Sequence, residues 1–203
     1  FPLIDTSSGT NFTNTWRECS GLTSFPLIDT SSGTTFQETW LSCSGIGGSF
    51  PLINTSSGTN FSNTWRSCSG ITTFPLIDTS SGTNFESTWM SCSNLTSFPS
   101  IDTSSGTNFK YTWRQCSSLT SFPAINVSNG TDFTNSWMQC SGITTFPSVN
   151  FSSGTDFDRA WSGCTSLTTY PANQFNTTGT LVSDAFVNAW RNCALTAQSI
   201  ENI

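Results

Sequence analysis

Cysteine is the residue whose type and spacing first point to chemistry in this chain of 203 residues. There are eight cysteines, one in each copy of a repeat and each three residues after a tryptophan. Zinc binding would need clustered ligands, but the chain has no His and no C-x-x-C pair. Neighbouring copies would place Cys Cα atoms about 5 Å apart, within disulfide range, but with parallel side chains that do not face each other. We therefore predict free, buried thiols that pack as small apolar groups.

A column of Asp and Asn side chains offers a second possible chemistry. Carboxylates about 5 Å apart repel one another unless a cation such as Ca²⁺ lies between them. Alternatively, each side chain accepts a hydrogen bond from the backbone of the T-S-S-G turn that follows it. Asn replaces Asp freely in the column, which favours turn capping, and we predict no metal site and no cofactor. The column consists of Asp5, Asp29, Asn54, Asp78, Asp102, Asn126 and Asn150.

Composition argues against several classes of function. Without His, and with acids that occur singly and serines that lack an activating partner, the chain does not have the groups of an enzyme active site. The net charge of −6 and the absence of a basic run argue against nucleic-acid partners. No apolar stretch approaches the roughly 20 residues that span a bilayer, so membrane insertion is not expected.

The elements that position these residues follow from the repeat. Phe-Pro, or once Tyr-Pro, recurs every 24 residues, with one extra residue in the second copy. Each copy then contains F-x-x-x-W-x-x-C, whose i, i+4, i+7 spacing predicts a helix of about two turns. The L-T-S segment before Phe-Pro predicts a short parallel strand, and D-T-S-S-G predicts a polar turn.

One copy alone cannot bury its two Phe, Trp, Cys, Leu and Ile side chains, whereas stacked copies can. The predicted fold is therefore an α/β solenoid, a right-handed coil of eight repeats of about 24 residues with short parallel strands and short helices. Its core would consist of ladders in which each column packs on its own copies. We expect seven regular repeats over 1–169, and a divergent eighth repeat with a C-terminal cap over 170–203.

The segments C-S-G-L-T-S-F-P and F-x-x-x-W-x-x-C together resemble the BspA-type leucine-rich repeat, C-x-x-L-x-x-I-x-I-P…A-F-x-x-C, over essentially the whole chain. The versions with Trp before Cys look most like repeats of bacterial and bacteriophage surface proteins. In this chain Pro follows Phe directly, two places earlier than in the family pattern, and Trp replaces a smaller residue. The resemblance implies a leucine-rich-repeat-like solenoid with a binding or scaffold role and without catalysis.

Positions that vary between copies are the candidate binding surface, because they make each copy distinct while the core columns are held. We predict that they lie on the solvent side of the helices, where Arg, Met, Tyr and Leu are contact-prone residue types. The Thr and Ser of L-T-S and T-S-S-G form more uniform faces that suit glycans or a repeating lattice. The candidates are Arg17, Leu41, Arg66, Met90, Lys110, Tyr111, Arg114, Met138 and Arg159.

These features predict a non-enzymatic protein of the cell surface or virion, extracellular in either case, that acts in adhesion or recognition of a protein or glycan receptor. The alternative is a structural filament or fibre subunit whose coil faces mediate assembly. The first copy lacks the C-S-G-L-T-S that precedes every other Phe-Pro, which would leave Phe12 and Trp16 open on one side. We therefore expect further coils, a capping domain or another subunit at the Phe1 end.

Overall fold

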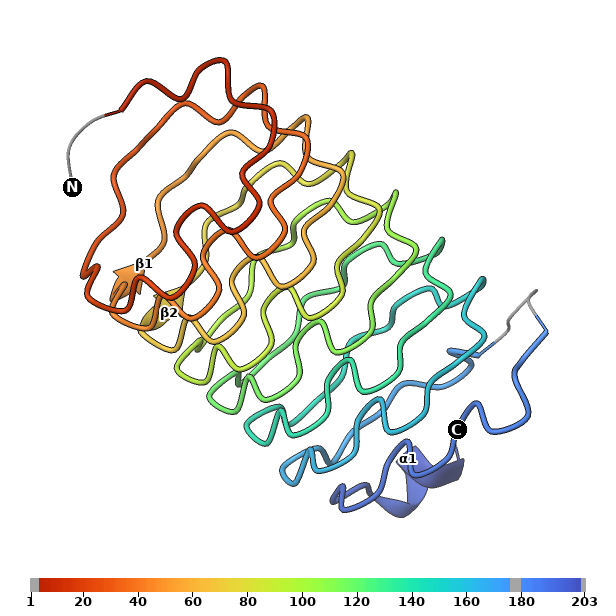
Figure 1. Ribbon diagram of the computed structural model, residues 1–203. Helices are drawn as coiled ribbons and strands as arrows, with labels where there is room; N and C mark the ends of the chain where they lie inside the picture. Colours follow the sequence, from red (N-terminus) through yellow and green to blue (C-terminus); the bar gives the residue numbers. More distant parts are fainter. Residues whose placement is uncertain (1–3, 176–179, 202–203) are drawn as a thin grey trace.

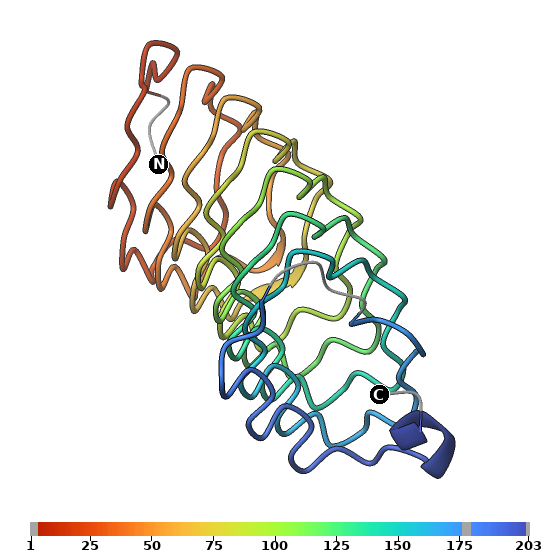
Figure 2. The same cartoon turned by 90° about the vertical axis from the view of Figure 1, so that its right-hand side faces the viewer.

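The computed structural model describes residues 4–175 and 180–201, and it shows the chain winding into coils stacked side by side (Figure 1). The two ends of the chain lie at opposite ends of the stack, as the turned view also shows (Figure 2). Each coil spans 24 or 25 residues and begins at its Phe-Pro or Tyr-Pro pair. Backbone hydrogen bonds join residues one coil apart, as from Phe36 N to Asn60 O at 2.8 Å.

Regular secondary structure is sparse in the described part of the chain. Strands β1 (Gly48–Ser49) and β2 (Ile71–Thr73) form a parallel pair, with Gly48 opposite Ile71, and helix α1 (Ala197–Glu201) lies near the end of the chain. Isolated parallel bridges join other coils, mainly through the residue before the second Phe, as between Asn84 and Asn108. The prediction of an α/β solenoid of leucine-rich-repeat type, with a strand and a helix in every repeat, is therefore wrong.

The predicted helices are series of tight turns. In the coil that begins at Phe74, the N–H groups of Thr88 and Cys92 donate to the carbonyls three residues earlier. The residues between donate to the next coil, as from Trp89 N to Thr112 O at 2.9 Å. Ser87 and Ser91 have positive φ angles of 55° and 62°, which end any right-handed helix. The spacing of four between Phe and Trp thus reflects successive turns.

The predicted strands are short because turns and proline limit them on both sides. Leu95 N donates to Cys92 O at 3.1 Å and closes a turn, while Phe98-Pro99 begins the next coil. Only Thr96 and Ser97 remain extended between them, with one hydrogen bond from Thr96 N to the preceding coil. Proline cannot donate a further ladder bond. Pairing beyond bridges therefore occurs, among the described residues, only between β1 and β2.

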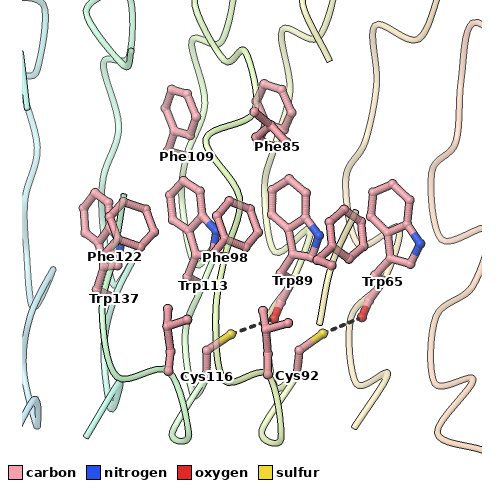
Figure 3. Close-up of a cluster of buried hydrophobic side chains, with 14 of the residues drawn as sticks. Trp65, Phe85, Trp89, Cys92, Phe98, Phe109, Trp113, Cys116, Phe122 and Trp137 are labelled. Atoms are coloured by element: carbon pink, nitrogen blue, oxygen red, sulfur yellow. Dashed lines mark hydrogen bonds between the residues drawn. The ribbon is translucent and has the colours of Figure 1, made fainter. Parts of the chain in front are cut away.

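The core consists of aromatic columns that run along the stack, as the column pattern predicts (Figure 3). The Trp89 ring stacks between Trp65 and Trp113, with centroid distances of 5.8 and 5.9 Å. The ring of Phe98 meets Trp89 edge-on at 4.9 Å. At the first coil Phe12 and Trp16 are buried, 4% and 5% exposed, so the expected open aromatic end is not seen at these residues. Phe1 lies outside the described residues.

The buried indole N–H groups point at aromatic rings. Nε1 of Trp113 faces the ring of Phe98, whose plane is at 83° to the indole with a centroid distance of 5.6 Å (Figure 3). The same perpendicular pairing recurs along the stack, and an N–H over a ring face is a weak hydrogen bond. This contact gives a partner to indoles that lack a conventional acceptor: Trp40, Trp65, Trp89, Trp113, Trp137, Trp161 and Trp190.

Glycine ends each T-S-S-G turn because the second Phe packs against its Cα. A Cβ on Gly82 would lie 2.5 Å from Cζ of Phe85 and 3.0 Å from the carbonyl oxygen of Thr79. The amide of Gly82 also closes the turn by donating to that carbonyl at 2.8 Å. The turn therefore leaves no room for a side chain at this position.

At the other end of the stack, Ser199 of α1 contacts the last described coil. Its hydroxyl accepts from Tyr170 N at 3.1 Å and donates to Thr168 O at 3.2 Å. Thr196 N also donates to Thr168 O at 3.0 Å. These bonds fasten α1 to the edge of the stack. The proposed division at residue 169 stays a prediction.

The left-handed residues predict a test of the turn geometry. Ser67 has a φ of 61°, and glycine occupies the equivalent place at Gly163. Ser67→Val is expected to lower the free energy of unfolding by about 1–2 kcal/mol, because a β-branched residue is strained at positive φ. Ser67→Gly should keep or raise stability. Urea denaturation measures both, with Thr72→Val on extended, exposed backbone as the control; a valine tolerated equally at both places would contradict the turn geometry.

Candidate binding surface

The thiols are free and take part in the packing, as predicted. Cys92 Sγ donates to the Trp65 carbonyl of the preceding coil at 3.1 Å, and Cys116 makes the same contact with Trp89 at 3.2 Å (Figure 3). Burial raises the pKa of Cys92 to about 12. A thiol held in the protonated form is a poor nucleophile and a poor metal ligand, so this column serves the structure.

The Asp and Asn column caps turns, as the sequence favoured. Oδ1 of Asp78 accepts from the backbone N–H and the hydroxyl of Ser80, at 3.0 and 2.7 Å. These bonds, the hydroxyl bond first, lower the pKa of Asp78. Asn54 makes the same contacts with Ser56, which shows that no charge is needed. Within 4–175 and 180–201, no three Asp, Glu, Cys or His side chains converge as metal ligands.

Some of the nine predicted surface residues are already paired or buried. Nη1 of Arg17 lies 2.6 Å from Oε2 of Glu38 on the next coil. Arg159 lies 3.9 Å from the Asp158 carboxylate. Leu41 is only 9% exposed, so its assignment to the solvent-facing surface is wrong. In addition, none of these residues lies on a helix, because the segment consists of turns.

Four of the predicted residues come together on the coils that begin at Phe50, Phe74 and Phe98. They line a cavity of 270 Å³ that we call the arginine pocket. Nη1 of Arg66 donates to Oδ1 of Asn63 at 3.2 Å. The pocket is lined by Arg66, Met90, Tyr111 and Arg114, together with Asn63 and Glu86.

Tyr111 organises the positive charges beside this pocket. The Lys110 ammonium and the Arg114 guanidinium lie 5.5 and 5.6 Å from the centroid of its ring, within the range of cation–π attraction. Tyr111 itself has a φ of 58°, a left-handed turn position. The turn thus places a tyrosine between two cations that are four residues apart in the sequence.

A second hollow, which the sequence reasoning missed, lies beside the arginine pocket. It measures 530 Å³, and we call it the Ser-Gln groove. Ser91 and Gln115 directly follow the pocket residues Met90 and Arg114, and the Ser91 hydroxyl lies 3.0 Å from Gln115 Oε1. The signal was the recurrence of Ser or Gln two residues after Trp and of Ser after Cys. Its lining includes Ser91, Ser93, Gln115, Ser117, Gln139 and Ser141.

Two further features complete the surface. Met138 and Arg159 line another cavity, of 300 Å³, together with Arg191. Three leucines stand out at the third position of F-P-L-I in consecutive coils, with exposed fractions between 62% and 69%. Sequence reasoning missed this apolar strip, although Ser or Ala replaces Leu there in the later coils. The strip consists of Leu27, Leu52 and Leu76.

The uniform threonine faces are used largely for structure. The Thr83 hydroxyl donates to the Thr59 carbonyl of the preceding coil at 3.2 Å, and Thr107 donates to Thr83 in the same way. On the other face, Thr96 donates to Thr72 O at 3.1 Å. Since these hydroxyl hydrogens are engaged between coils, the faces offer a ligand mainly acceptor oxygens.

Comparisons of the chain with protein-family models, with curated proteins and with solved structures found no significant match. The resemblance to BspA-type repeats therefore rests on the sequence pattern. No helix within the described part of the chain has the length and apolar character required to cross a membrane.

Proposed function

We propose that this protein is a non-enzymatic recognition protein of a cell surface or virion, and that it binds a glycan along the Ser-Gln groove and the adjoining arginine pocket. The observation that carries the proposal is the groove itself. It crosses successive coils, and its lining combines hydroxyl groups with amides such as those of Gln115 and Gln139. Hydroxyls and amides both donate and accept hydrogen bonds, which matches the mixed donors and acceptors of a sugar.

The character of the groove favours a glycan over a protein receptor. Protein interfaces are centred on buried aromatic or apolar anchors. The lining of the Ser-Gln groove contains no aromatic or aliphatic side chain among the residues described. An elongated polar ligand lying along the stack would meet the same Ser or Gln position on each coil it crosses. The repeat would thus provide a row of equivalent contacts.

The state of the nucleophilic groups supports a non-enzymatic role. Burial raises the pKa of Cys140 to about 12, as it does for Cys92. Both thiols are therefore protonated at neutral pH, and each donates to a backbone carbonyl. Neither of the two hollows on the proposed surface contains a cysteine.

A structural fibre subunit is the second candidate, and the leucine strip is the observation that favours it. Leu27, Leu52 and Leu76 are exposed on consecutive coils, and a row of exposed apolar side chains is a common feature of contact surfaces. In this alternative, coil faces mediate assembly and the polar groove serves solubility.

Glycan binding predicts a selective loss on removing the groove amides. We expect the protein to bind at least one member of a panel of immobilised glycans and whole cells. Gln115→Gly with Gln139→Gly should weaken that binding about tenfold or more, because several hydrogen bonds are lost together. Glycine suits the left-handed backbone at both places, where φ is 64° and 62°, so folding should persist.

The matched control is Ser100→Ala with Ser121→Ala, two exposed hydroxyls outside the groove. It should bind like the wild type in the same panel, and urea denaturation checks that all variants fold. Absence of glycan binding, together with self-association that Leu52→Ser abolishes, would contradict the proposal and favour the fibre subunit.

A further inference from the structure

Three of the six basic residues gather around the arginine pocket without a carboxylate partner. Within the described residues, no Asp or Glu oxygen lies within 4.0 Å of the cationic groups of Arg66, Lys110 or Arg114, whereas Arg17 and Arg159 are both ion-paired. In a chain with a net charge of −6, this is a local concentration of positive charge.

The acid nearest to these cations is turned to another partner. Glu86 lines the pocket, but its Oε2 accepts from Nδ2 of Asn108 at 3.3 Å. The pocket therefore contains one carboxylate against two guanidinium groups, with the Lys110 ammonium beside it. The balance leaves a net positive field at its mouth.

Both arginines are held before any ligand arrives. Arg66 donates to Asn63, and Arg114 lies over the ring of Tyr111. Nε of Arg114 is buried and donates to no acceptor in the described structure. A guanidinium that is fixed in place and retains a free donor is suited to an anion, because its planar fork matches a carboxylate. Little side-chain entropy would be lost on binding.

The pocket is continuous with the Ser-Gln groove through the chain itself. Met90 is followed by Ser91, and Arg114 by Gln115, so one turn contributes to both hollows. Along this column, Arg66 and Arg114 are two coils apart, with Met90 between them. Two coils correspond to about 10 Å, so the two guanidiniums can meet charges on a chain that lies along the stack.

We propose that the arginine pocket binds the carboxylate of an acidic sugar unit, and that the glycan recognised in the groove is a polyuronate. This inference rests on the proposed function and adds the charge of the ligand to it. Arg66 and Arg114 pair with carboxylates of the polymer, while groove amides and hydroxyls contact its sugar hydroxyls. Lys110 contributes to the attraction from beside the pocket.

The test measures binding of the whole chain to polygalacturonate, to its fully methyl-esterified form and to a neutral glucan. Esterification removes the charge while it keeps the sugar backbone, so the ester should bind at least about tenfold more weakly than the acid. Arg66→Gln and Arg114→Gln should each cause a similar loss for the acid and little change for the ester. Arg17→Gln, which alters a paired arginine outside the pocket, is the matched control and should bind like the wild type.

Two more polymers identify the source of the anion. Stronger binding of dextran sulfate than of polygalacturonate would overturn the assignment to a carboxylate, and equal binding of polyglutamate would overturn the assignment to a sugar. Equal binding of the acid, the ester and the glucan, unaffected by Arg114→Gln, would overturn the inference and leave the proposed function standing. Failure to bind any glycan, acidic or neutral, in folded protein would refute both.

Discussion

Replacement of Trp89 with alanine is expected to lower the free energy of unfolding by about 3–5 kcal/mol. The Trp89 side chain is fully buried, and its ring stacks on those of Trp65 and Trp113. It also meets the rings of Phe74 and Phe98 edge-on, at 5.5 and 4.9 Å. Truncation would leave a cavity between four rings that the neighbouring coils hold in place. Urea denaturation followed by circular dichroism measures the loss.

Trp190→Ala is the matched control for this experiment. Trp190 is half-buried and stacks on Trp161 at 5.3 Å, with no second indole stacked on it in the described part of the chain. Its truncation should therefore cost clearly less than that of Trp89. Equal losses at the two sites would contradict the account in which stability comes from a continuous ladder, since that account requires partners on both sides.

The buried columns could be predicted because the repeat determines which side chains align. With 24 residues per coil, Trp65, Trp89 and Trp113 occupy equivalent places, and none of them could be buried without the others. The same reasoning placed Cys92 correctly as a free thiol inside the stack. These predictions depend only on the period and on the need to bury apolar surface.

Local backbone conformation could not be predicted in this way, because the spacing of Phe, Trp and Cys fits both a helix and successive turns. The choice is made by bonds to the next coil, such as that from Ser91 N to Arg114 O at 2.7 Å, which a helix would not form. One signal was present: the second residue after Phe and the second after Trp is never Thr, Val or Ile in a chain rich in threonine. Those positions have positive φ, which β-branched residues avoid.

The candidate site was predictable only as a set of variable positions. Which arginines are available depends on neighbours a coil away, as for Arg17 and Glu38, and these pairs follow from side-chain geometry. Leu41 shows the same limit, because it is buried although its column also carries arginines and methionines. The Ser-Gln groove arises from the alignment of small and polar residues, and single copies of the repeat do not reveal it.

Alkaline pH is expected to destabilise the protein by several kcal/mol, through the thiols. Burial raises the pKa of both Cys92 and Cys140 from the ordinary value of 9.0 to about 12. Burial raises the pKa of Cys68, Cys116 and Cys164 in the same direction. A group with a raised pKa in the folded state favours folding fully below its unfolded pKa. That contribution is lost as the pH rises from 9 toward the folded value, because only the unfolded chain releases the proton.

Each pKa unit corresponds to about 1.4 kcal/mol, so Cys92 and Cys140 alone should cost about 3 kcal/mol by about pH 10. The other buried thiols add to this loss, which is large beside a typical stability of about 5–15 kcal/mol. Urea denaturation at a series of pH values under reducing conditions measures the slope. The double variant Cys92→Ala, Cys140→Ala starts less stable near neutrality, but its stability should fall less steeply above pH 9 because two protons are missing from the linkage. An unfolding free energy that stays constant from about pH 8 to pH 10, or equal slopes in the two proteins, would show that the thiols do not ionise on unfolding in the manner that their burial requires.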